Sequence, residues 1–434
     1  MNKRNPAGWE RALIEQMSKQ ADFTIRTVSI LGQPRTMYYL KSMVSLSQTL
    51  DMLDSLLSES TPLDPSMDNL VVDWVLRGNV LVGNSDSDAP LGLRPVKLQH
   101  NRPIMTSQIE QPLQVSFDSF TEELYTNIGL LRKKLIRPDL AVETFTTGTS
   151  TRRDLALVYI QGEAKESIVS FVKQKLHDNL PRDIHNVSDL LKMLDQPRFS
   201  LVPTYLSTEL PEETSQNLLE GKVILLIDQF PFALAFPAII KDLWSLKSDL
   251  NYPPLFRMFS RFIRIAGLLF AVVTPGMYII MNSVNPELLR IQLAISVAKS
   301  REGVPYPAII EVFLMMLMLE MVIEATIRLP KSIGPTITMI GGIILGQAIV
   351  QAHLVSNLLI IVLATSTIAN FTMAGFLNTI GIRIFKYATI LCSTMFGIFG
   401  LEASIIWLCV YLAGLNASSV PYLSFSLKGR SSHE

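Results

Sequence analysis

The sequence predicts an α/β half made of two related subdomains, followed by an α-helical polytopic membrane domain. Three observations favour this fold class. The 434-residue chain is 48% hydrophobic and only 18% charged, whereas charged residues make up roughly a quarter of a typical soluble domain. Charged and apolar residues are divided unevenly between the two halves. A pattern of strands and helices also occurs twice before residue 240.

The charge of the chain changes sign between its halves. Of 38 basic and 38 acidic residues, 14 basic and 9 acidic ones follow from Lys241 onward, which leaves 24 and 29 before it. The first half is therefore net −5 and the second net +5. No basic excess is available to neutralise phosphates, so no nucleic acid is expected as a partner. The first fifteen residues contain no apolar signal region, so we expect the N-terminal half in the cytoplasm.

The first half divides into two subdomains, at residues 1–117 and 118–240, with a proline-rich linker at the end of the first. Both have the order helix, strand, strand, helix, strand, in apolar runs bounded by Gly and Pro. A chance similarity between generic α/β stretches is the alternative. The matching segments are Ala21–Val28 with Pro138–Phe145, Met37–Leu40 with Leu157–Ile160, Ser47–Leu57 with Glu166–Leu176, and Arg77–Val82 with Glu220–Leu225.

The sequence contains no catalytic motif. It lacks the phosphate-binding loop, the dinucleotide-binding glycines, the nucleophile elbow and the HExxH zinc motif. His177 and His185 lie near acidic residues in a polar stretch, where solvated loop residues are a better interpretation than a metal site. The two cysteines, Cys392 and Cys409, are too few for a disulfide framework or a cysteine zinc site. We therefore expect no enzymatic activity, no metal and no cofactor.

The second half, residues 241–434, contains five long and weakly charged runs. Each approaches or exceeds the ~20 residues that a helix needs to cross a bilayer. Basic groups fit the cytoplasmic side at alternate borders, but Lys428 and Arg430 in the tail would then lie outside. One run is therefore expected to be re-entrant or interfacial, which predicts four to five spanning or re-entrant helices. The runs are Ile265–Asn282, Val304–Ile327, Ile333–Val350, Leu354–Phe376 and Tyr387–Leu415.

The second run carries three acidic residues, and ionisable groups inside a membrane are candidates for function because their burial is costly. Glu320 and Glu324 share a helix face with Arg328, whereas Glu311 lies nearly opposite. One interpretation is a cation-attracting pore with a hydrophobic constriction. The other is a Glu324–Arg328 ion pair, with Glu311 buried against a partner. The residues assigned to the ion path under the first interpretation are Glu311, Glu320, Glu324, Met316 and Leu317.

Turn formers and small residues surround the acidic run. Gly303 and Pro305 force a turn before it. Gly342 and Gly346 in the next run allow helices to approach closely, and Gln347 adds a polar group. Close packing without transport is the favoured interpretation of these glycines. The residues assigned to helix packing or gating are Gly303, Pro305, Gly342, Gly346, Gln347 and Arg328.

Several short motifs occur in order along the chain. Arg301-Glu-Gly-Val-Pro-Tyr-Pro307 precedes the acidic run, and Gly342-Ile-Ile-Leu-Gly-Gln347 follows it. Asn127-Ile-Gly-Leu-Leu-Arg132 and Ala156-Leu-Val-Tyr-Ile-Gln-Gly162 lie in the first half. With these motifs the chain resembles the A subunit of bacterial spore germinant receptors, the GerA family, over nearly its whole length. One departure is Asp228-Gln229, where the family pattern has Asp-Gly.

The resemblance implies a subunit in the inner membrane of the bacterial spore, with its N-terminal half on the cytoplasmic, spore-core side. The implied partners are further copies of the chain in an expected pentamer, a transporter-like B subunit that binds the germinant, and a lipoprotein C subunit. The implied activity is a nutrient-gated channel that passes monovalent cations across the lipid membrane and triggers germination. A sensor or scaffold without its own pore and a secondary transporter are the alternatives.

Overall fold

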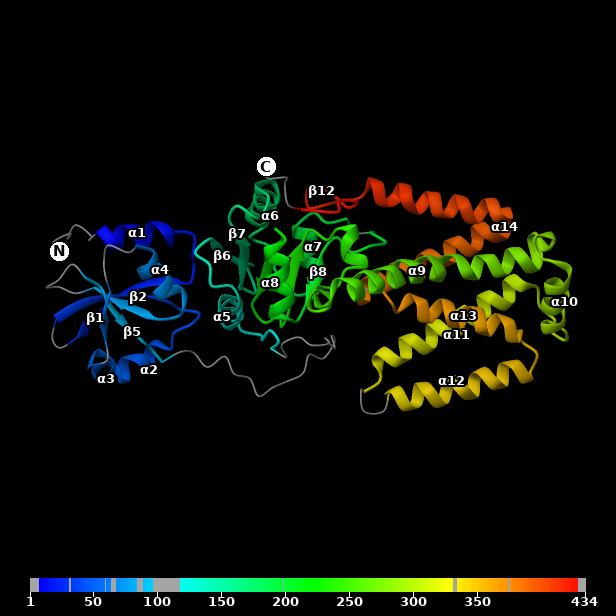
Figure 1. The fold of residues 1–434 in the computed structure, drawn as a ribbon, viewed down its shortest axis with the longest axis horizontal. Coiled ribbons are helices and arrows are strands. Elements are labelled where there is room, and N and C mark those ends of the chain that lie inside the picture. The colour runs from blue at the N-terminus through cyan, green and yellow to red at the C-terminus, as the bar shows by residue number, and fades with distance from the viewer. Residues whose placement is uncertain are drawn as a thin grey trace. The chain divides into compact units, whose positions relative to one another are not determined.

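The computed structural model describes residues 8–30, 33–58, 60–63, 68–83, 89–96, 118–197, 199–330, 334–373 and 375–427. The chain forms two compact units, which Figure 1 shows as an α/β part and a helical part. The first unit comprises Met1–Arg198, Thr204–Ile239 and Asn416–Glu434. The second comprises Phe199–Pro203 and Ile240–Leu415, so the backbone passes between the units four times.

The first unit contains two five-stranded antiparallel sheets of the same topology. The strand orders are β1-β2-β4-β5-β3 and β6-β7-β9-β10-β8, so each strand of the first sheet has a counterpart at the same place in the second. This equivalence confirms the predicted pair of related α/β subdomains. The strands are β1 (Phe23–Ile30), β2 (Gln33–Leu40), β3 (Thr61–Pro62), β4 (Val80–Val82), β5 (Leu91–Leu93), β6 (Leu140–Thr147), β7 (Arg153–Ile160), β8 (Leu206–Thr208), β9 (Val223–Ile227) and β10 (Ala233–Phe236).

The helices of the two copies correspond less closely than the strands. The helix predicted over Ser47–Leu57 is divided at Met52, whereas its counterpart is continuous. Each sheet also has two short strands that the sequence did not indicate, because two to four residues are too few to show alternation. The helices are α1 (Gly8–Gln16), α2 (Leu46–Asp51), α3 (Leu53–Ser58), α4 (Asp68–Leu76), α5 (Leu124–Lys134), α6 (Glu166–Asp178), α7 (Val187–Met193) and α8 (Pro211–Leu219).

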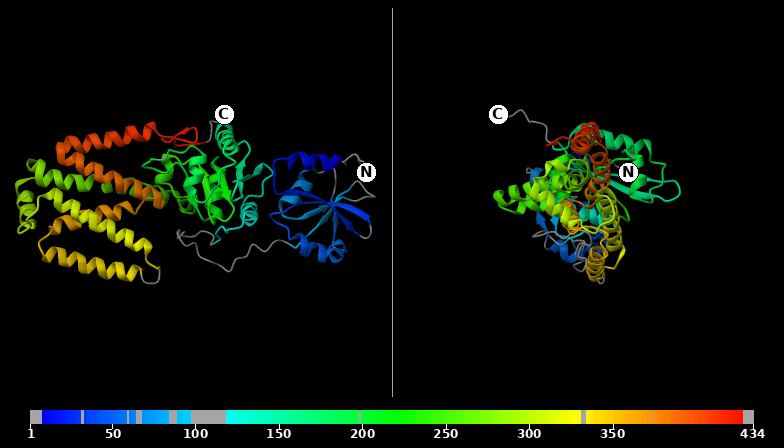
Figure 2. Two further views of the ribbon diagram at one scale, coloured as in Figure 1. Left: turned by 180° about the vertical axis from the view of Figure 1, so that it is seen from behind. Right: turned by 90° about the vertical axis from the view of Figure 1, so that its right-hand side faces the viewer.

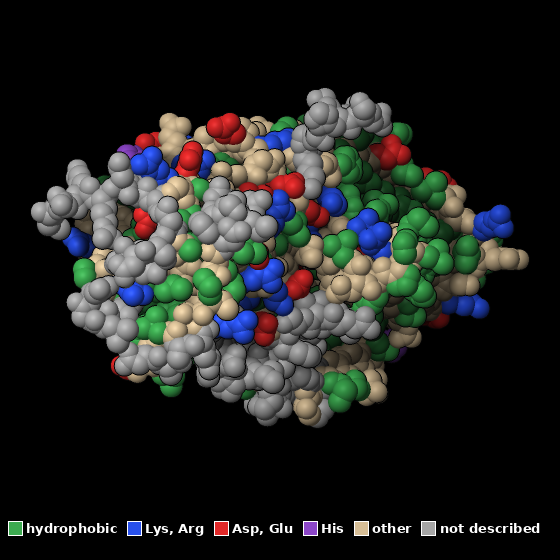
Figure 3. Space-filling model, turned by 60° about the vertical axis from the view of Figure 1, so that its left-hand side comes forward, with side chains coloured by type: hydrophobic (Ala, Val, Ile, Leu, Met, Phe, Trp, Pro, Cys, Tyr) green, Lys and Arg blue, Asp and Glu red, His purple; other side chains and the backbone are tan. Residues whose placement is uncertain are grey.

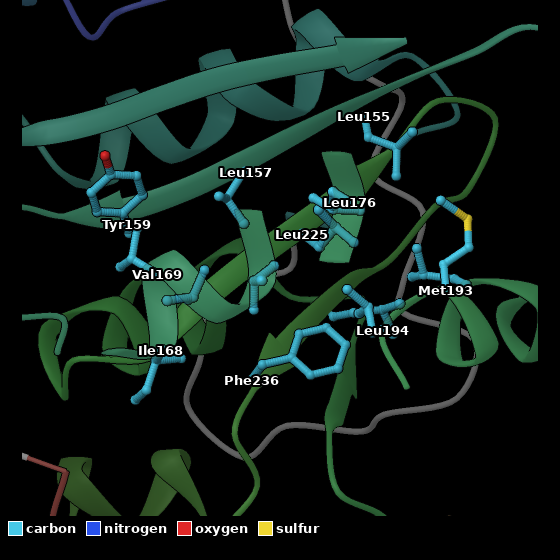
Figure 4. Close-up of a cluster of buried hydrophobic side chains, with 14 of the residues drawn as sticks. Leu155, Leu157, Tyr159, Ile168, Val169, Leu176, Met193, Leu194, Leu225 and Phe236 are labelled. Atoms are coloured by element: carbon cyan, nitrogen blue, oxygen red, sulfur yellow. The ribbon is translucent and has the colours of Figure 1, made fainter. Parts of the chain in front are cut away.

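Strand β7 has side chains in two hydrophobic cores, because successive residues of a strand point to opposite faces of the sheet. Leu155, Leu157 and Tyr159 belong to one core, which Figure 4 shows beside α6 and α7. Ala156 and Val158 belong to the core on the other face, with α5. Both faces of the second sheet are therefore covered, which explains why this strand reads as a continuous apolar run rather than an alternating one.

The turn between β9 and β10 places Gln229 in the left-handed region, with φ of 68°. This is the position at which the family pattern has glycine, and only glycine adopts such a φ without steric cost. Gln229→Gly should therefore raise the free energy of unfolding of the first unit by about 1 kcal/mol. Urea unfolding of the full chain measures the change. The backbone hydrogen bond from Gln229 N to Glu122 O is kept in the variant, so a loss of stability would contradict this expectation.

The C-terminal segment belongs to the first unit, although the sequence pattern grouped it with the apolar half. It forms β11 (Asn416–Ala417) and β12 (Val420–Pro421). Val420 and Leu427 join the same hydrophobic core as Leu155 and Phe236. Gln196 Nε2 donates to Ser418 Oγ at 3.1 Å. Because this segment is short and its apolar residues are interrupted by serines, its sequence alone does not indicate packing into a distant core.

The second unit consists of helices that run back and forth along its length (Figure 1). A π-helical turn, Ile280–Val284, extends the first long helix, and the short 3-10 segments Ile240–Leu243, Lys247–Asn251 and Pro286–Leu288 occur in its connections. The helices are α9 (Pro254–Ile279), α10 (Ile291–Ser300), α11 (Ala308–Arg328), α12 (Gly334–Gln351), α13 (Asn357–Asn370) and α14 (Phe376–Gly414).

Within the part of this unit that the structure describes, two segments, Pro254–Val284 and Thr379–Gly414, are long and apolar enough to cross a membrane. Only 39% and 22% of their most apolar stretches are buried within the protein. A core helix of a soluble protein would bury most of its apolar surface, and soluble monomers seldom expose large apolar patches. Figure 3 shows hydrophobic side chains gathered at its right-hand side, where this unit lies, with Lys, Arg and acidic side chains scattered among them. These features are those of a membrane protein.

Helix α14 is interrupted at Gly397, whose φ and ψ of 59° and −136° are not helical. The chain turns back at this residue, so the second part of α14 lies antiparallel to the first (Figure 1 and Figure 2). The last apolar run of the sequence therefore contains two helical segments instead of one. The glycine is required because its left-handed φ is one that other residues adopt only with strain.

Candidate functional site: the ion pairs and polar cavity of the helical unit

Glu311 lies in the first turn of α11 and is fully buried. Its Oε1 accepts a hydrogen bond of 2.5 Å from the backbone N of Ser356, and its Oε2 accepts one of 3.3 Å from the hydroxyl of Tyr278. The Nε of Arg301 lies 3.4 Å from Oε2. A buried carboxylate needs such partners to offset its desolvation. Glu311 thus fixes the start of α11 against α9 and the start of α13.

The turn before α11 brings Arg301 to this carboxylate. Gly303 has φ of 87°, and a Cβ atom at this residue would lie 3.2 Å from Nδ1 of His353. Pro305 lies within the same turn, and Arg301 Nη2 donates to the backbone oxygen of Tyr306 at 3.0 Å. The motif that begins at Arg301 is therefore a tight turn whose arginine faces the acid one helical turn into α11.

Glu320 forms an ion pair with Arg383 of α14, 63 residues away. Nε of the arginine donates to Oε1 at 3.1 Å, and Nη2 donates to Oε2, so the pair is bidentate. Lys386 follows three residues later on the same helix and is only 5% exposed. Its Nζ donates to the backbone oxygen of Ser366 at 3.4 Å. Arg383 and Lys386, which precede the last apolar run, are thus directed at α11 and α13.

These groups line a small cavity of about 20 Å³ between α9, α11, α13 and α14. Met316 forms part of its apolar wall and is 6% exposed. Charged and apolar side chains of the helical unit therefore meet in this cavity. Its polar wall comprises Glu320, Ser366, Thr367, Asn370, Arg383 and Lys386.

Glu324 lies one turn beyond Glu320 but does not share its partner, and forms an exposed ion pair with Arg328, at 2.7 Å. The structure therefore does not bring the three acids of α11 together. Both contacts of the ion-pair interpretation are present, although Glu324 is also on a largely exposed face of α11, where Phe313 packs edge-to-face against Tyr387 of α14. Leu317 is half exposed on this face, unlike its neighbour Met316. The large exposed residues of the face are Ile310, Phe313, Leu317, Met321, Glu324 and Arg328.

The glycines of α12 meet nothing in the described part of the chain. A Cβ atom at Gly342 or at Gly346 would have no heavy atom within 4 Å, apart from its own helix backbone and chain neighbours. Gln347 is exposed on the same helix. Close packing at these glycines would require a surface other than the described part of the chain.

A profile of the family described as Bacillus/Clostridium GerA spore germination protein matches residues 11–433. The chain belongs to this family. Spore germination protein B1 of Bacillus subtilis (strain 168) is 35% identical over 70% of this chain and 63% of its own length. Spore germination protein KA of the same organism is 31% identical, over 87% of this chain and 70% of its own. Spore germination protein A1, also from Bacillus subtilis (strain 168), is 27% identical over 96% and 91%.

The GerA-family chain is also similar to a solved structure, the N-terminal domain of the A subunit of the Bacillus megaterium spore germinant receptor GerK3. The identity is 22% and the TM-score is 0.37, with 53% of this chain and 94% of that chain covered. The chain spans about two thirds of the length of relatives such as B1 and KA. Germinant-receptor subunits of the GerA family are non-enzymatic, in agreement with the prediction from motifs.

Sequence reasoning missed the partners of the acids in this GerA-family chain. No pattern in the sequence links Glu311 to its three partners, which are Tyr278, Ser356 and Arg301. A signal did exist for Arg383 and Lys386, because two basic residues between the last two apolar runs require partners where they lie within the membrane domain. Among the described residues, no group of three His, Cys, Asp or Glu side chains could hold a metal ion.

Proposed function

We propose that the protein is the A subunit of a spore germinant receptor and forms a nutrient-gated cation channel in the inner spore membrane. The supporting observation is the family match, which extends over both the α/β and the helical unit. In this proposal, it assembles as a pentamer and acts with a transporter-like B subunit and a lipoprotein C subunit. Monovalent cations leave the spore core when the B subunit binds the germinant.

The chain path constrains the topology of such a subunit. The helical stretch from Ile240 to Leu415 begins and ends at the first unit, because residues 416–427 pack into its hydrophobic core. If that unit lies in the spore core, the stretch crosses the membrane an even number of times. The reversal at Gly397 supplies one return path that the hydropathy pattern did not show.

The largely exposed face of α11 supports its assignment to the ion path. It has apolar residues through Met321 and ends in the ionised pair of Glu324 and Arg328. In the proposal, Leu317 forms the constriction and Glu324 attracts cations at its mouth. Glu311, Glu320 and Met316 hold the helix in place from its covered side. The open glycines of α12 provide a surface for a neighbouring copy, since small residues let membrane helices approach closely.

Glu324→Gln should lower monovalent cation flux about fivefold. A lost carboxylate removes about 1 kcal/mol of attraction for a cation in a wet vestibule. Flux is measured with the purified oligomer, together with its B and C subunits and germinant, in liposomes at equal protein density. Glu402→Gln is the matched control, because Glu402 is an exposed acid of the same unit on α14.

Unaltered flux in Glu324→Gln would sink the assignment of this face to the ion path. Liposomes that do not conduct with native protein would favour the alternative of a sensor or scaffold without its own pore. Glu311→Gln separates structure from conduction. It should reduce the amount of folded oligomer, because the backbone N of Ser356 and the Arg301 guanidinium lose their charged partner.

A further inference from the structure

Helices α11 and α14 pack antiparallel. Arg383 of α14 forms the bidentate pair with Glu320 of α11. One turn further along α14, Tyr387 meets Phe313, which lies two turns earlier on α11, and their ring centroids are 6.3 Å apart. Later residues of α14 therefore face earlier residues of α11. A lengthwise slide of α14 would change the partners of the side chains in this contact.

The charges of the two helices match in a second register as well as in the observed one. On α11, Glu324 follows Glu320 by one turn, and on α14, Lys386 follows Arg383 by one turn. A slide of α14 by three residues, or about 4.5 Å, brings Lys386 opposite Glu320. Because the helices are antiparallel, the same slide brings Arg383 opposite Glu324. The second register therefore has two ion pairs between these helices, where the observed register has the single pair of Arg383 with Glu320 among the described residues.

The observed register leaves Lys386 in an unfavourable place. The residue is 5% exposed, and its Nζ donates to the backbone oxygen of Ser366 at 3.4 Å. It forms no ion pair with the described residues, and the positive charge of Arg383 lies one turn away on the same helix. A buried ammonium without a counter-charge is costly, and like charges one turn apart repel. Lys386 therefore favours the second register, in which Glu320 neutralises it.

The first part of α14 is fixed at one place and bounded by glycines at both ends. The backbone oxygen of Leu201 lies so close to Gly381 that a Cβ atom there would be 1.7 Å from it, which holds the observed register. Leu201 belongs to the segment Phe199–Pro203, whose neighbours on both sides belong to the α/β unit. Gly375 and Gly397 have φ of 81° and 59°, and such element-terminal residues can absorb the backbone change of a slide.

We propose that α14 has two registers on α11, one turn apart, and that Glu320 exchanges Arg383 for Lys386 between them. In the second register Arg383 pairs with Glu324 and places a positive charge at the mouth of the proposed ion path, which opposes the entry of cations. The register thus regulates that path, and the observed register is the one that attracts cations. This consequence rests on the proposed function, whereas the existence of the two registers does not.

Disulfide formation between introduced cysteines distinguishes the registers, because it requires Cα atoms within about 7 Å of each other. Phe313→Cys with Tyr387→Cys reports the observed register, in which the two rings are in contact. Leu317→Cys with Tyr387→Cys reports the second, in which position 387 faces one turn further along α11. Both pairs are made in the full-length chain, with the native cysteines removed as Cys392→Ser and Cys409→Ser. The protein is oxidised in membranes that also contain the B and C subunits.

Two variants are combined with each cysteine pair. Lys386→Met removes the charge that favours the second register, so it should slow disulfide formation by the second pair about tenfold. Arg383→Met leaves Glu320 to Lys386, so it should speed that reaction by about the same factor. The first pair should respond in the opposite direction. Lys299→Met, which removes an exposed lysine on α10, is the control and should change neither rate.

The second pair decides the proposal. An unchanged rate for this pair in Lys386→Met would overturn it, and so would a rate that does not rise in folded Arg383→Met. If Arg383→Met does not fold, Lys386→Met still decides, because it removes a buried charge and should raise the unfolding midpoint of the protein. No ion flux enters the measurement, so a protein without its own pore gives the same disulfide rates.

Discussion

Asp22→Ala should lower the free energy of unfolding of the α/β unit by about 3–5 kcal/mol, since it leaves a buried guanidinium without its counter-charge. Arg132 Nε and Nη2 donate to the two carboxylate oxygens of Asp22 at 2.7 and 2.5 Å. The side chains are 2% and 0% exposed. Ser42 Oγ donates to Asp22 at 2.5 Å, and Gln20 accepts from Arg132 at 2.6 Å. Urea unfolding of the full-length protein measures the loss.

This ion pair joins the two α/β copies. Asp22 immediately precedes β1, and Arg132 lies on α5 of the second copy. The backbone around it also crosses between the copies, because Ala21 N donates to Val142 O at 2.8 Å and Val142 N donates to Lys19 O at 3.0 Å. Loss of the pair should therefore loosen the contact between the sheets. Hydrogen exchange at β6 reports this directly.

Asp139→Ala is the matched control for this prediction. Asp139 forms an ion pair with Arg137 at 2.6 Å, but the two side chains are 31% and 35% exposed. Solvent-exposed pairs contribute about 0–1 kcal/mol, so this variant should change stability little. Equal losses in Asp22→Ala and Asp139→Ala would show that burial of the first pair has no special effect. The double variant Asp22→Leu with Arg132→Leu should recover part of the loss, since no unpaired charge remains.

Gly381→Ala should detach the segment Phe199–Pro203 from α14. A Cβ atom at Gly381 would lie 1.7 Å from the backbone oxygen of Leu201, which cannot move without the chain around it. The backbone N of Leu201 also donates to the hydroxyl of Tyr411 at 2.9 Å. Overpacking of this kind costs about 1–3 kcal/mol or more, because neighbouring backbone must shift.

Hydrogen exchange of the peptide that contains Leu201 measures this detachment, and thermal unfolding measures the stability. Gly414→Ala on the same helix is the control, because a Cβ atom there meets nothing within 4 Å. That substitution should be neutral or stabilising, as alanine favours helix over glycine by about 1 kcal/mol. Unchanged protection of Leu201 in Gly381→Ala would contradict the contact. The segment belongs to the helical unit although its neighbours on both sides belong to the α/β unit.

The α/β duplication was predictable because it depends on local patterns. Pro138–Phe145 and Leu157–Ile160 coincide with most of β6 and the end of β7, and the repeat identified their counterparts in the first copy. The pattern failed where elements are short or irregular. Strands such as β3 have too few residues for alternation, and the break at Met52 has no proline or glycine to mark it.

The acids of α11 show the limit of a helical projection. Periodicity places Glu320 and Glu324 on one face, and they are neighbours on the helix. The structure separates their roles, because Arg383 reaches Glu320 and leaves Glu324 to the exposed Arg328. Which acid is covered depends on how α14 packs against α11. The two residues of this contact, Glu320 and Arg383, lie 63 positions apart in the chain. The periodicity of one helix contains no information about such a distant partner.

The sequence by itself determined the division into an α/β and an apolar half, the duplication in the first, and the family, because hydropathy, alternation and motif order are local properties. The tertiary structure decided the pairing of Asp22 with Arg132, 110 residues apart, the reversal of α14 at Gly397 and the return of the C-terminal segment to the first unit. These features depend on which distant surfaces meet, since a buried charge or a short apolar segment is stabilised only by partners that folding brings to it.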